Sequence, residues 1–588
     1  MSTEIAPSSL SAAARPFELR TTPNRERRSM FRLFAPHCLD AYKLNHRPMY
    51  PKGTEYVYSN FTVRNMKHLK IPAEYRDNKY VVYGVEAAMK EIVALWDETF
   101  FTRPKEEVLA QYRNRVPAFT GKEAYVQHLA DLHDLGYLPI RVKMLPEGSR
   151  VNVGVPFLTI VNTLPDYFWL TNGLETNISN EIWKPMTVAT IAHAYRRMLT
   201  DYAEKTGSPK DFIDWQGHCF ADRGMSGMMD AAKSCSGHST SFLGTDSVSS
   251  MDWIDFVYQG KDSFNGGSVG ASEHAVMCVD GKDGEVDTIR RIITLPEFED
   301  GVVSIVSDTW DFWHVITEVT QKLKPVILGR KFNALGLSKV VFRPDSGDPA
   351  DVICGTARSV KSLDWDGLKS IYLEVGKDQV RRGVFGVEPI VVEHRGKYYQ
   401  VVENPAASPT EPIFKEVTPT PQQKGAVACL WDEFGGEITS KGYKAVSQRV
   451  GLIYGDSITP EIALAVLKRL EEKGFASCNI VFGIGSYTYQ YITRDTLGAA
   501  IKATFAVVNG VGREMAKDPA TDVDKTKKSA RGLLKVLRAQ EAEGERFILV
   551  DQVDWDEEDT GSLRVGLEDG NFLVNTPFAE IKERLLAA

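Results

Sequence analysis

Polar residues follow four apolar runs in the middle of the chain. The segments VVSIVSDTWD, SKVVFRPDSGD, VGLIYGDS and CNIVFGIGSY contain, just past a predicted strand, the residues Asp308, Arg343, Asp345, Asp456 and Gly485. Continuous β-branched apolar runs are typical of parallel strands buried on both faces, and α/β folds bind ligands at the carboxyl ends of such strands. Carboxylates at these ends could bind ribose hydroxyls, hold Mg²⁺ or stabilise a cationic transition state. The pattern predicts one shared site.

Each of these features also has a plainer interpretation. A carboxylate after a strand commonly caps the next helix, and a glycine there can serve only a turn. Gly455, Gly483 and Gly485 would let a phosphate approach the backbone, but the chain has neither a Walker A loop nor a complete dinucleotide-binding fingerprint. The missing phosphate loop argues against an ATP-dependent kinase.

Further candidate residues come earlier in the chain. The segment CFADRG places Phe220 three residues before Arg223, and an aromatic ring with a nearby guanidinium suits a flat heteroaromatic ring that carries phosphate. The segment GTDS adds a polar turn with Asp246, and SEHA contains His274 beside Glu273, an acid that could raise the basicity of the imidazole. A core phenylalanine, a surface arginine and a structural histidine are the alternatives. No zincin, serine-hydrolase or protein-kinase signature is present.

Length and composition constrain the elements that must position these residues. The chain has 588 residues, too many for one core, so we expect two or more structural units. A net charge of −8 argues against a protein that coats nucleic acid. No apolar run of about 18 residues occurs, so we expect no membrane partner. Seven scattered cysteines without a C-x-x-C pair favour a reducing compartment, the cytoplasm, and make a cysteine-based zinc site unexpected.

The residue patterns also predict a domain organisation. We expect residues 1–30 to be a flexible polar tail, because they lack the apolar core of a signal peptide. Residues 31–190 together with 500–588 predict a β-rich domain with helices, and residues 191–499 repeat the strand–helix pattern of an α/β barrel. Residues 377–444, rich in Pro, Thr and Gln, predict a surface insertion, with a β-hairpin and a loose connector, between barrel units.

An ordered set of motifs resembles the nicotinamide phosphoribosyltransferase family. The motifs LDAYKLNH, YVYSNFTVR, YFWLTNGLET, FADRG, FLGTDS, ASEH, VSDTWD, RPDSGDP, YGDS, FGIGS, TRD and KDP follow one another from about Leu39 to the C-terminal region. The resemblance implies a homodimer with a type II phosphoribosyltransferase α/β barrel plus a β-rich second domain. It also implies transfer of the phosphoribosyl group of 5-phosphoribosyl 1-pyrophosphate to nicotinamide with Mg²⁺, which gives nicotinamide mononucleotide and pyrophosphate for NAD salvage.

The same resemblance implies roles for individual residues. The nicotinamide ring would lie between Phe220 and Tyr42 of the partner subunit, and its amide would donate to Asp246. His274 would be phosphorylated by ATP in an auxiliary cycle that drives synthesis, and Mg²⁺ would be bound mainly through pyrophosphate. The residues implied as catalytic are His274, Asp308, Asp345 and Asp456. The remaining substrate-binding positions implied are Arg223, Arg343, Gly455, Gly485, Ser486, Arg494, Lys517, Arg64 and Asp40.

Two other functions fit part of this pattern. A nicotinate phosphoribosyltransferase is the nearest alternative, and Asp246 argues against it because a carboxylate accepts from an amide but repels a second carboxylate. A catalytically silent binding protein with the same fold is the other, and the retained charged cluster argues against it. Ser486 stands where the resemblance predicts a second glycine, and Asp222 replaces an aromatic residue. These departures bear on kinetic detail more than on the reaction class.

Overall fold

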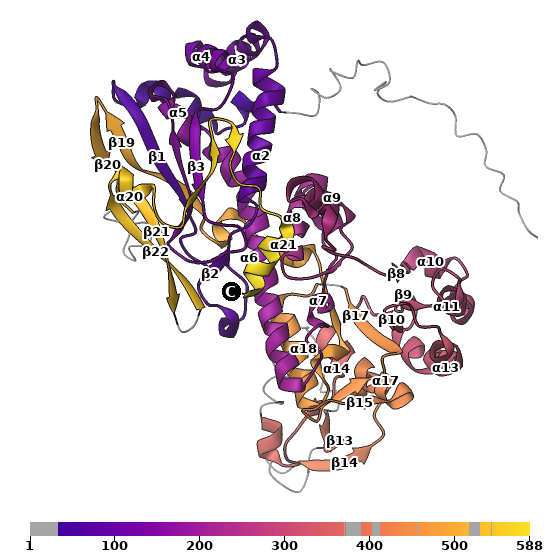
Figure 1. Cartoon of the computed structure of the whole chain (residues 1–588). Coiled ribbons are helices and arrows are strands. Elements are labelled where there is room, and N and C mark those ends of the chain that lie inside the picture. The colour runs from indigo at the N-terminus through magenta and orange to yellow at the C-terminus, as the bar shows by residue number, and fades with distance from the viewer. Residues whose placement is uncertain are drawn as a thin grey trace, which may run out of the picture.

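The computed structural model describes residues 33–369, 371, 390–402, 412–455, 457–516, 530–541 and 544–587. The predicted tail, Asp456, Lys517 and part of the predicted insertion lie outside the described residues, so what the sequence predicts for them stays a prediction. Two large sheets organise the described part of the chain, one antiparallel and one parallel (Figure 1).

The antiparallel sheet combines strands from both ends of the chain. Its strand β1 (Thr54–Thr62) pairs on one side with β19 (Ala500–Val508), more than 400 residues later, with Thr62 opposite Ala500. On the other side it pairs with β5 (Pro156–Asn162), with Phe61 opposite Leu158. The indigo and orange ribbons therefore lie side by side in Figure 1. The strand order is β20 (Val511–Glu514), β19 (Ala500–Val508), β1 (Thr54–Thr62), β5 (Pro156–Asn162), β3 (Ile140–Met144), β23 (Arg564–Glu568) and β24 (Asn571–Phe572).

Smaller elements surround this sheet. Helices with buried apolar faces pack around it, because the apolar side chains of β1 and β5 need cover from water. The elements are the strand pairs β2 (Lys79–Val81) with β4 (Arg150–Asn152) and β21 (Leu533–Glu541) with β22 (Gly544–Val553), and the helices α2 (Val85–Trp96), α3 (Lys105–Thr120), α4 (Gln127–Leu135), α5 (Phe168–Gly173), α20 (Trp555–Glu558) and α21 (Phe578–Ala587).

The parallel sheet contains all of the predicted strand ends. Every pairing in it is parallel, and Gly244 of one edge strand bridges to Gly267, three residues before the other edge strand. The sheet is therefore curled until its edges approach, which confirms an α/β barrel beside a β-rich part. The strand order is β7 (Gly244–Thr245), β6 (Gly217–Cys219), β18 (Val481–Ile484), β17 (Val450–Tyr454), β10 (Ser338–Arg343), β9 (Gly301–Val306) and β8 (Gly270–Ala271).

Helices cover this barrel, and local signals explain where several of them begin. Asp348 caps the helix that follows β10, since its side chain accepts a hydrogen bond from the backbone N of Asp351 at 3.0 Å. Thr459 caps the helix after β17, and Pro460 occupies its first position. The helices are α8 (Met228–Ser239), α9 (Val248–Val257), α10 (His274–Cys278), α11 (Glu285–Thr294), α13 (Thr320–Gly329), α14 (Pro349–Cys354), α18 (Pro460–Glu472) and α19 (Ser486–Tyr489).

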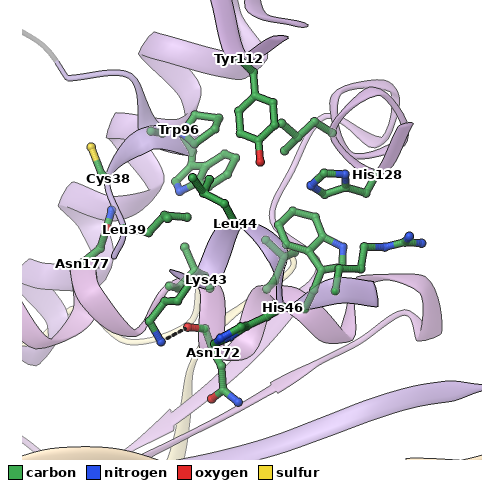
Figure 2. A pocket seen from close by; sticks show the side chains of 18 of the residues that line it. Cys38, Leu39, Lys43, Leu44, His46, Trp96, Tyr112, His128, Asn172 and Asn177 are labelled. Atoms are coloured by element: carbon green, nitrogen blue, oxygen red, sulfur yellow. Dashed lines mark hydrogen bonds between the residues drawn. The ribbon is translucent and has the colours of Figure 1, made fainter. Parts of the chain in front are cut away.

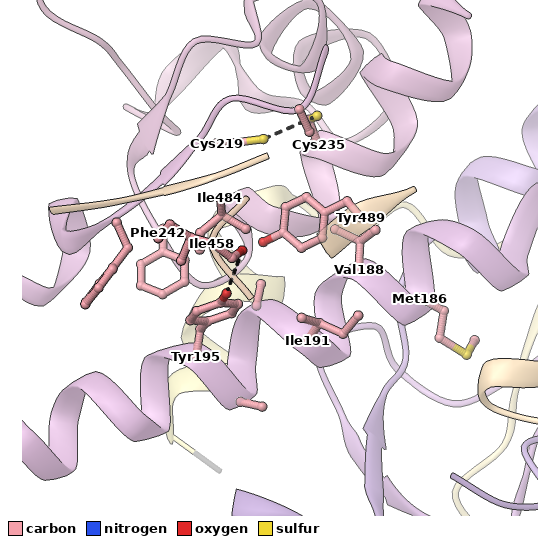
Figure 3. Packing of buried hydrophobic residues seen from close by; sticks show 14 of the residues in the cluster. Met186, Val188, Ile191, Tyr195, Cys219, Cys235, Phe242, Ile458, Ile484 and Tyr489 are labelled. Carbon is pink, nitrogen blue, oxygen red and sulfur yellow. Dashed lines mark hydrogen bonds between the residues drawn. The ribbon is translucent and has the colours of Figure 1, made fainter. Parts of the chain in front are cut away.

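One long helix, α6 (Glu175–Thr206), connects the two parts (Figure 1). It spans residue 190, where the sequence predicts a domain boundary, and the domain limits stay predictions. Figure 3 shows Val188, Ile191 and Tyr195 of this helix among barrel residues such as Ile458. Tyr195 donates to the backbone oxygen of Ile458 at 3.2 Å. The helix is thus part of the barrel core as well as a link to the β-rich part.

The tight crossing of α8 over α6 yields a stability prediction. A Cβ atom on Gly237 would lie 2.7 Å from the backbone oxygen of Pro185 and 3.2 Å from the backbone N of Ala189. Gly237→Ala is therefore expected to reduce the free energy of unfolding by about 1–3 kcal/mol, seen as a lower melting temperature. Gly329→Ala in α13 is the matched control, because a Cβ there would meet no atom within 4 Å. Equal melting temperatures for the two variants would contradict the close crossing.

The described part of the predicted insertion contains antiparallel β structure and two helices. Strand β12 (Val391–His394) pairs antiparallel with β13 (Lys397–Val402), which pairs antiparallel with β14 (Ile413–Val417). A small separate core that includes Val392 and Val401 lies beneath this sheet. The other elements of the region are β11 (Arg358–Ser359), α16 (Pro421–Lys424), α17 (Ala426–Phe434), β15 (Gly436–Ile438) and β16 (Lys444–Val446).

Candidate active site

Residues from three strand ends meet at the carboxyl edge of the parallel sheet. A Cβ atom on Gly455, after β17, would lie 3.1 Å from Oδ1 of Asp345 and 3.5 Å from the ring of Phe220. A Cβ on Gly483 in β18 would lie 2.5 Å from the same ring. Glycine is required at position 483 because the aromatic ring lies directly against the backbone there, whereas the tightest contact at position 455 is with the carboxylate of Asp345. The structure therefore brings Phe220, Asp345 and Gly455 together, as predicted from the sequence.

Asp308 connects three further segments at this edge. Its Oδ2 accepts hydrogen bonds from the backbone N of Asp345 at 3.1 Å and from Oγ of Ser346 at 2.7 Å. Its Oδ1 lies 3.1 Å from Nε2 of His274, whose side chain is half-exposed. The acid in contact with His274 is therefore Asp308, not the neighbouring Glu273 suggested by the sequence. A buried carboxylate beside an accessible imidazole can orient that ring and stabilise its positive charge.

Asp246 lies at the end of β7, next to Phe220. Nε2 of His218 lies 2.8 Å from Oδ1 of Asp246, and Oγ of Ser268 donates to the same oxygen. Partial burial alone would raise the pKa of Asp246, but the hydrogen bond and charge of His218, aided by Ser268 and Arg343, lower it. The His218 and Phe220 rings lie 4.8 Å apart. His218 therefore contacts both an ionised acceptor and an aromatic ring, an arrangement that suits an amide on a flat heterocycle.

His218 and Ser268 were not among the predicted site residues. The sequence could have predicted His218, because it lies two residues before Phe220 and side chains two residues apart on a strand share a face. No comparable signal existed for Ser268, which reaches Asp246 only because the barrel closes between β7 and the segment before β8. Ser272 is also new, since its backbone oxygen accepts from Nη2 of Arg343 at 3.0 Å.

The end of β18 offers room for an anion. A Cβ on Gly485 would meet no atom within 4 Å, so the backbone there is open to a ligand. The next residue, Ser486, begins α19 and packs its hydroxyl against Gly224, where an added Cβ would overlap it. Arg223 precedes that glycine and is exposed. Ser486 therefore lies between the open glycine and the segment that carries Arg223.

Four predicted residues, Asp40, Tyr42, Arg64 and Arg494, have surroundings of their own away from the cluster. Oγ1 of Thr176 donates to Asp40 at 2.8 Å, and Nε of Arg64 donates to the backbone oxygen of Gly498 at 2.7 Å. Tyr42 is 61% exposed, and Arg494 pairs with the adjacent Asp495 at 3.4 Å. These contacts do not include Phe220, Asp246 or Asp345. Within the described residues of one chain, the structure therefore does not join Asp40, Tyr42, Arg64 or Arg494 to the cluster.

The segment with Asp40 and Tyr42 is nevertheless firmly anchored. Nζ of Lys43 donates to the backbone oxygen of Asn172 at 3.0 Å, a bond visible in Figure 2, and pairs with Glu175 at 2.6 Å. Leu39, Lys43 and Leu44 line a cavity of about 40 Å³ together with Trp96 and Tyr112 (Figure 2). The anchoring holds the segment on the start of α6 while the ring of Tyr42 stays in solvent.

Comparisons with known proteins agree with this geometry. Residues 215–547 match the model of the nicotinate phosphoribosyltransferase (NAPRTase) family. The chain belongs to this family. It is 45% identical over 557 residues to the nicotinamide phosphoribosyltransferase of Acinetobacter baylyi, covering 94% of this chain and 97% of that relative. It is 29% identical over 501 residues to the nicotinamide phosphoribosyltransferase of Mycoplasma pneumoniae, covering 83% of this chain and 92% of that relative.

A solved structure extends the comparison to the fold. The nicotinate-nucleotide pyrophosphorylase from Pyrococcus furiosus matches with a TM-score of 0.50 at 14% identity, over 94% of this chain and 95% of that chain. At this identity the likeness concerns the fold alone. Together with the family match, it confirms the type II phosphoribosyltransferase fold. Within the part of the chain that the structure covers, no helix is long and apolar enough to cross a membrane.

Proposed function

We propose that this chain transfers the 5-phosphoribosyl group from 5-phosphoribosyl 1-pyrophosphate to nicotinamide, releasing pyrophosphate and forming nicotinamide mononucleotide for NAD salvage. The observation that carries the proposal is the ionised Asp246, whose Oδ1 accepts from His218 and Ser268, with the ring of Phe220 packed 4.8 Å from that of His218. The ring of nicotinamide stacks on Phe220, and its amide donates to the remaining oxygen of Asp246. The family and the names of the relatives support the same reaction.

The carboxylates at the strand ends suit the transfer step. The bond from the anomeric carbon to pyrophosphate breaks while the ring nitrogen of nicotinamide forms the new bond, and the carbon passes through a cationic, oxocarbenium-like state. Asp345 and the ring of Phe220 both lie beside Gly455, close to where ribose would lie. The negative charge of Asp345 stabilises the cation, and Asp308 holds the backbone of Asp345 in place. The open backbone at Gly485 binds the 5-phosphate.

Mg²⁺ is proposed as the cofactor, held mainly through pyrophosphate. The strand ends fit such an ion, because Asp308 and Asp345 supply the oxygen ligands that Mg²⁺ prefers. When bound, the ion would neutralise the negative charge that develops on pyrophosphate. Asp456 and Lys517, outside the described residues, stay proposed contacts to the ribose and to pyrophosphate.

A second copy of this chain is the proposed partner. Among the described residues of one chain, Asp40, Tyr42, Arg64 and Arg494 do not contact the Phe220 cluster, and the Tyr42 ring is exposed on an anchored segment. In a homodimer, Tyr42 of the partner subunit would cover the free face of the nicotinamide ring, and the cations would contact pyrophosphate. All seven cysteines are free, which fits the reducing conditions of the cytoplasm, the proposed location.

ATP is proposed as an auxiliary substrate that phosphorylates His274. Contact with Asp308 orients the imidazole, and half of its side chain is open to solvent. We expect ATP labelled at its γ-phosphate to leave an acid-labile label on the wild-type protein and none on His274→Ala. Equal labelling of His274→Ala would assign the label elsewhere, and an unlabelled wild-type protein would remove ATP from the proposed reaction.

Product identity tests the proposed reaction. Purified protein is incubated with 5-phosphoribosyl 1-pyrophosphate, Mg²⁺ and equal amounts of nicotinamide and nicotinate, with and without ATP. We expect nicotinamide mononucleotide in well over tenfold excess, because a charge-assisted hydrogen bond is exchanged for repulsion when nicotinate binds. Turnover of nicotinate alone would contradict the proposal, and no turnover of either base would favour a binding protein.

A further inference from the structure

The two carboxylate oxygens of Asp246 differ in their hydrogen-bond donors. Oδ1 receives both close donors, Nε2 of His218 at 2.8 Å and the hydroxyl of Ser268. Among the described residues, none donates a hydrogen bond to Oδ2. Two donors on one oxygen restrict rotation of the carboxylate group and leave the lone pairs of the other oxygen for a ligand.

His218 is itself held on two sides. A Cβ on Gly244 would lie 2.8 Å from Nδ1 of His218, so the imidazole fills the space that a larger residue at this position would need. The ring of Phe220 lies 4.8 Å away, and the His218 side chain is only 10% exposed. Because an ionised carboxylate only accepts hydrogen bonds, Nε2 carries the proton in this contact. The imidazole is therefore a fixed donor aimed at Oδ1.

We propose that His218 is a positioning residue that sets the choice between nicotinamide and nicotinate by keeping Asp246 ionised and its Oδ2 turned toward the bound base. The proposal rests on the proposed function and extends it. An ionised Asp246 accepts from the amide of nicotinamide and repels the carboxylate of nicotinate. A protonated Asp246 could instead donate to nicotinate, and a rotated one would offer neither base a well-placed acceptor. Donation from His218 disfavours both alternatives.

Two substitutions distinguish the hydrogen-bond donor of His218 from its aromatic ring. His218→Phe keeps a flat ring beside Phe220 and removes the donor, whereas His218→Gln keeps an N–H donor near the position of Nε2. For His218→Phe we expect the ratio of kcat/KM for nicotinamide to that for nicotinate to decrease by about tenfold or more. Most of the loss should appear in the KM for nicotinamide, with the KM for 5-phosphoribosyl 1-pyrophosphate changed by less than about twofold. His218→Gln should restore the ratio to within about threefold of wild type.

Several outcomes would overturn the assignment. An unchanged ratio in His218→Phe, or a ratio in His218→Gln as low as in His218→Phe, would show that the donor does not set the preference. If His218→Phe does not fold, His218→Met removes the donor with a flexible apolar side chain that can still fill the space. An unchanged ratio in that variant would show that His218 serves packing alone. Failure of the wild-type protein to form nicotinamide mononucleotide would instead reject the proposed function.

Discussion

Asp345→Ala is expected to lower kcat for nicotinamide mononucleotide formation by about 10²–10³-fold, the usual effect of removing one preorganised group that stabilises transition-state charge. Asp345 lies beside Gly455 and Phe220, and its backbone is held by Asp308. The negative charge matters most when the anomeric carbon becomes cationic, so the loss should appear in kcat more than in the KM for nicotinamide. Steady-state kinetics with both substrates measure the effect.

Asp348→Ala is the matched control, because it removes the same side chain from the same loop. Asp348 caps α14 by accepting from the backbone N of Asp351. The expected cost is about 0.5–2 kcal/mol of the free energy of unfolding, with kcat kept within a few fold. If Asp345→Ala retained wild-type activity, or if both variants lost activity to the same extent, the catalytic assignment of Asp345 would be wrong.

Asp246→Asn is expected to decrease the preference for nicotinamide over nicotinate by about 10–100-fold. The asparagine loses the charge that strengthens the bond to the amide, and its own amide can donate to the carboxylate of nicotinate. His218 lowers the pKa of Asp246 against the effect of burial, so the carboxylate stays ionised as pH decreases. The wild-type preference should therefore remain constant down to about pH 5, above the usual range of an aspartate pKa.

Competition between the two bases at several pH values checks this expectation. Asp252→Asn, an exposed position on the following helix α9, is the control with the same loss of charge and should leave the ratio unchanged. A wild-type preference that disappears between about pH 7 and pH 5 would mean that Asp246 becomes protonated in that range. An unchanged ratio in Asp246→Asn would show that another residue selects between nicotinamide and nicotinate.

Local sequence patterns determined the parallel strands of the barrel and the edge of the sheet at which the site lies. Apolar runs that end in acids or glycine predict parallel strands with a site at their carboxyl ends, and the barrel places Asp308, Asp345 and Gly455 at that edge. This succeeds because side-chain alternation and strand termination are properties of neighbouring residues. The general expectation that a carboxylate after a strand caps the next helix holds for Asp348, which caps α14.

Tertiary structure alone decided which distant segments complete the site. Ser268 reaches Asp246 from 22 residues away because the sheet curls until Gly244 bridges to Gly267. His274 reaches Asp308 from 34 residues away because β8 pairs with β9. Likewise, β1 lies between β5 and the distant β19 in one antiparallel sheet. A strand pattern specifies which face is buried but not which strand lies beside it. That choice depends on packing the whole core, so the strand ends were predictable and the partners of Asp246 and His274 were not.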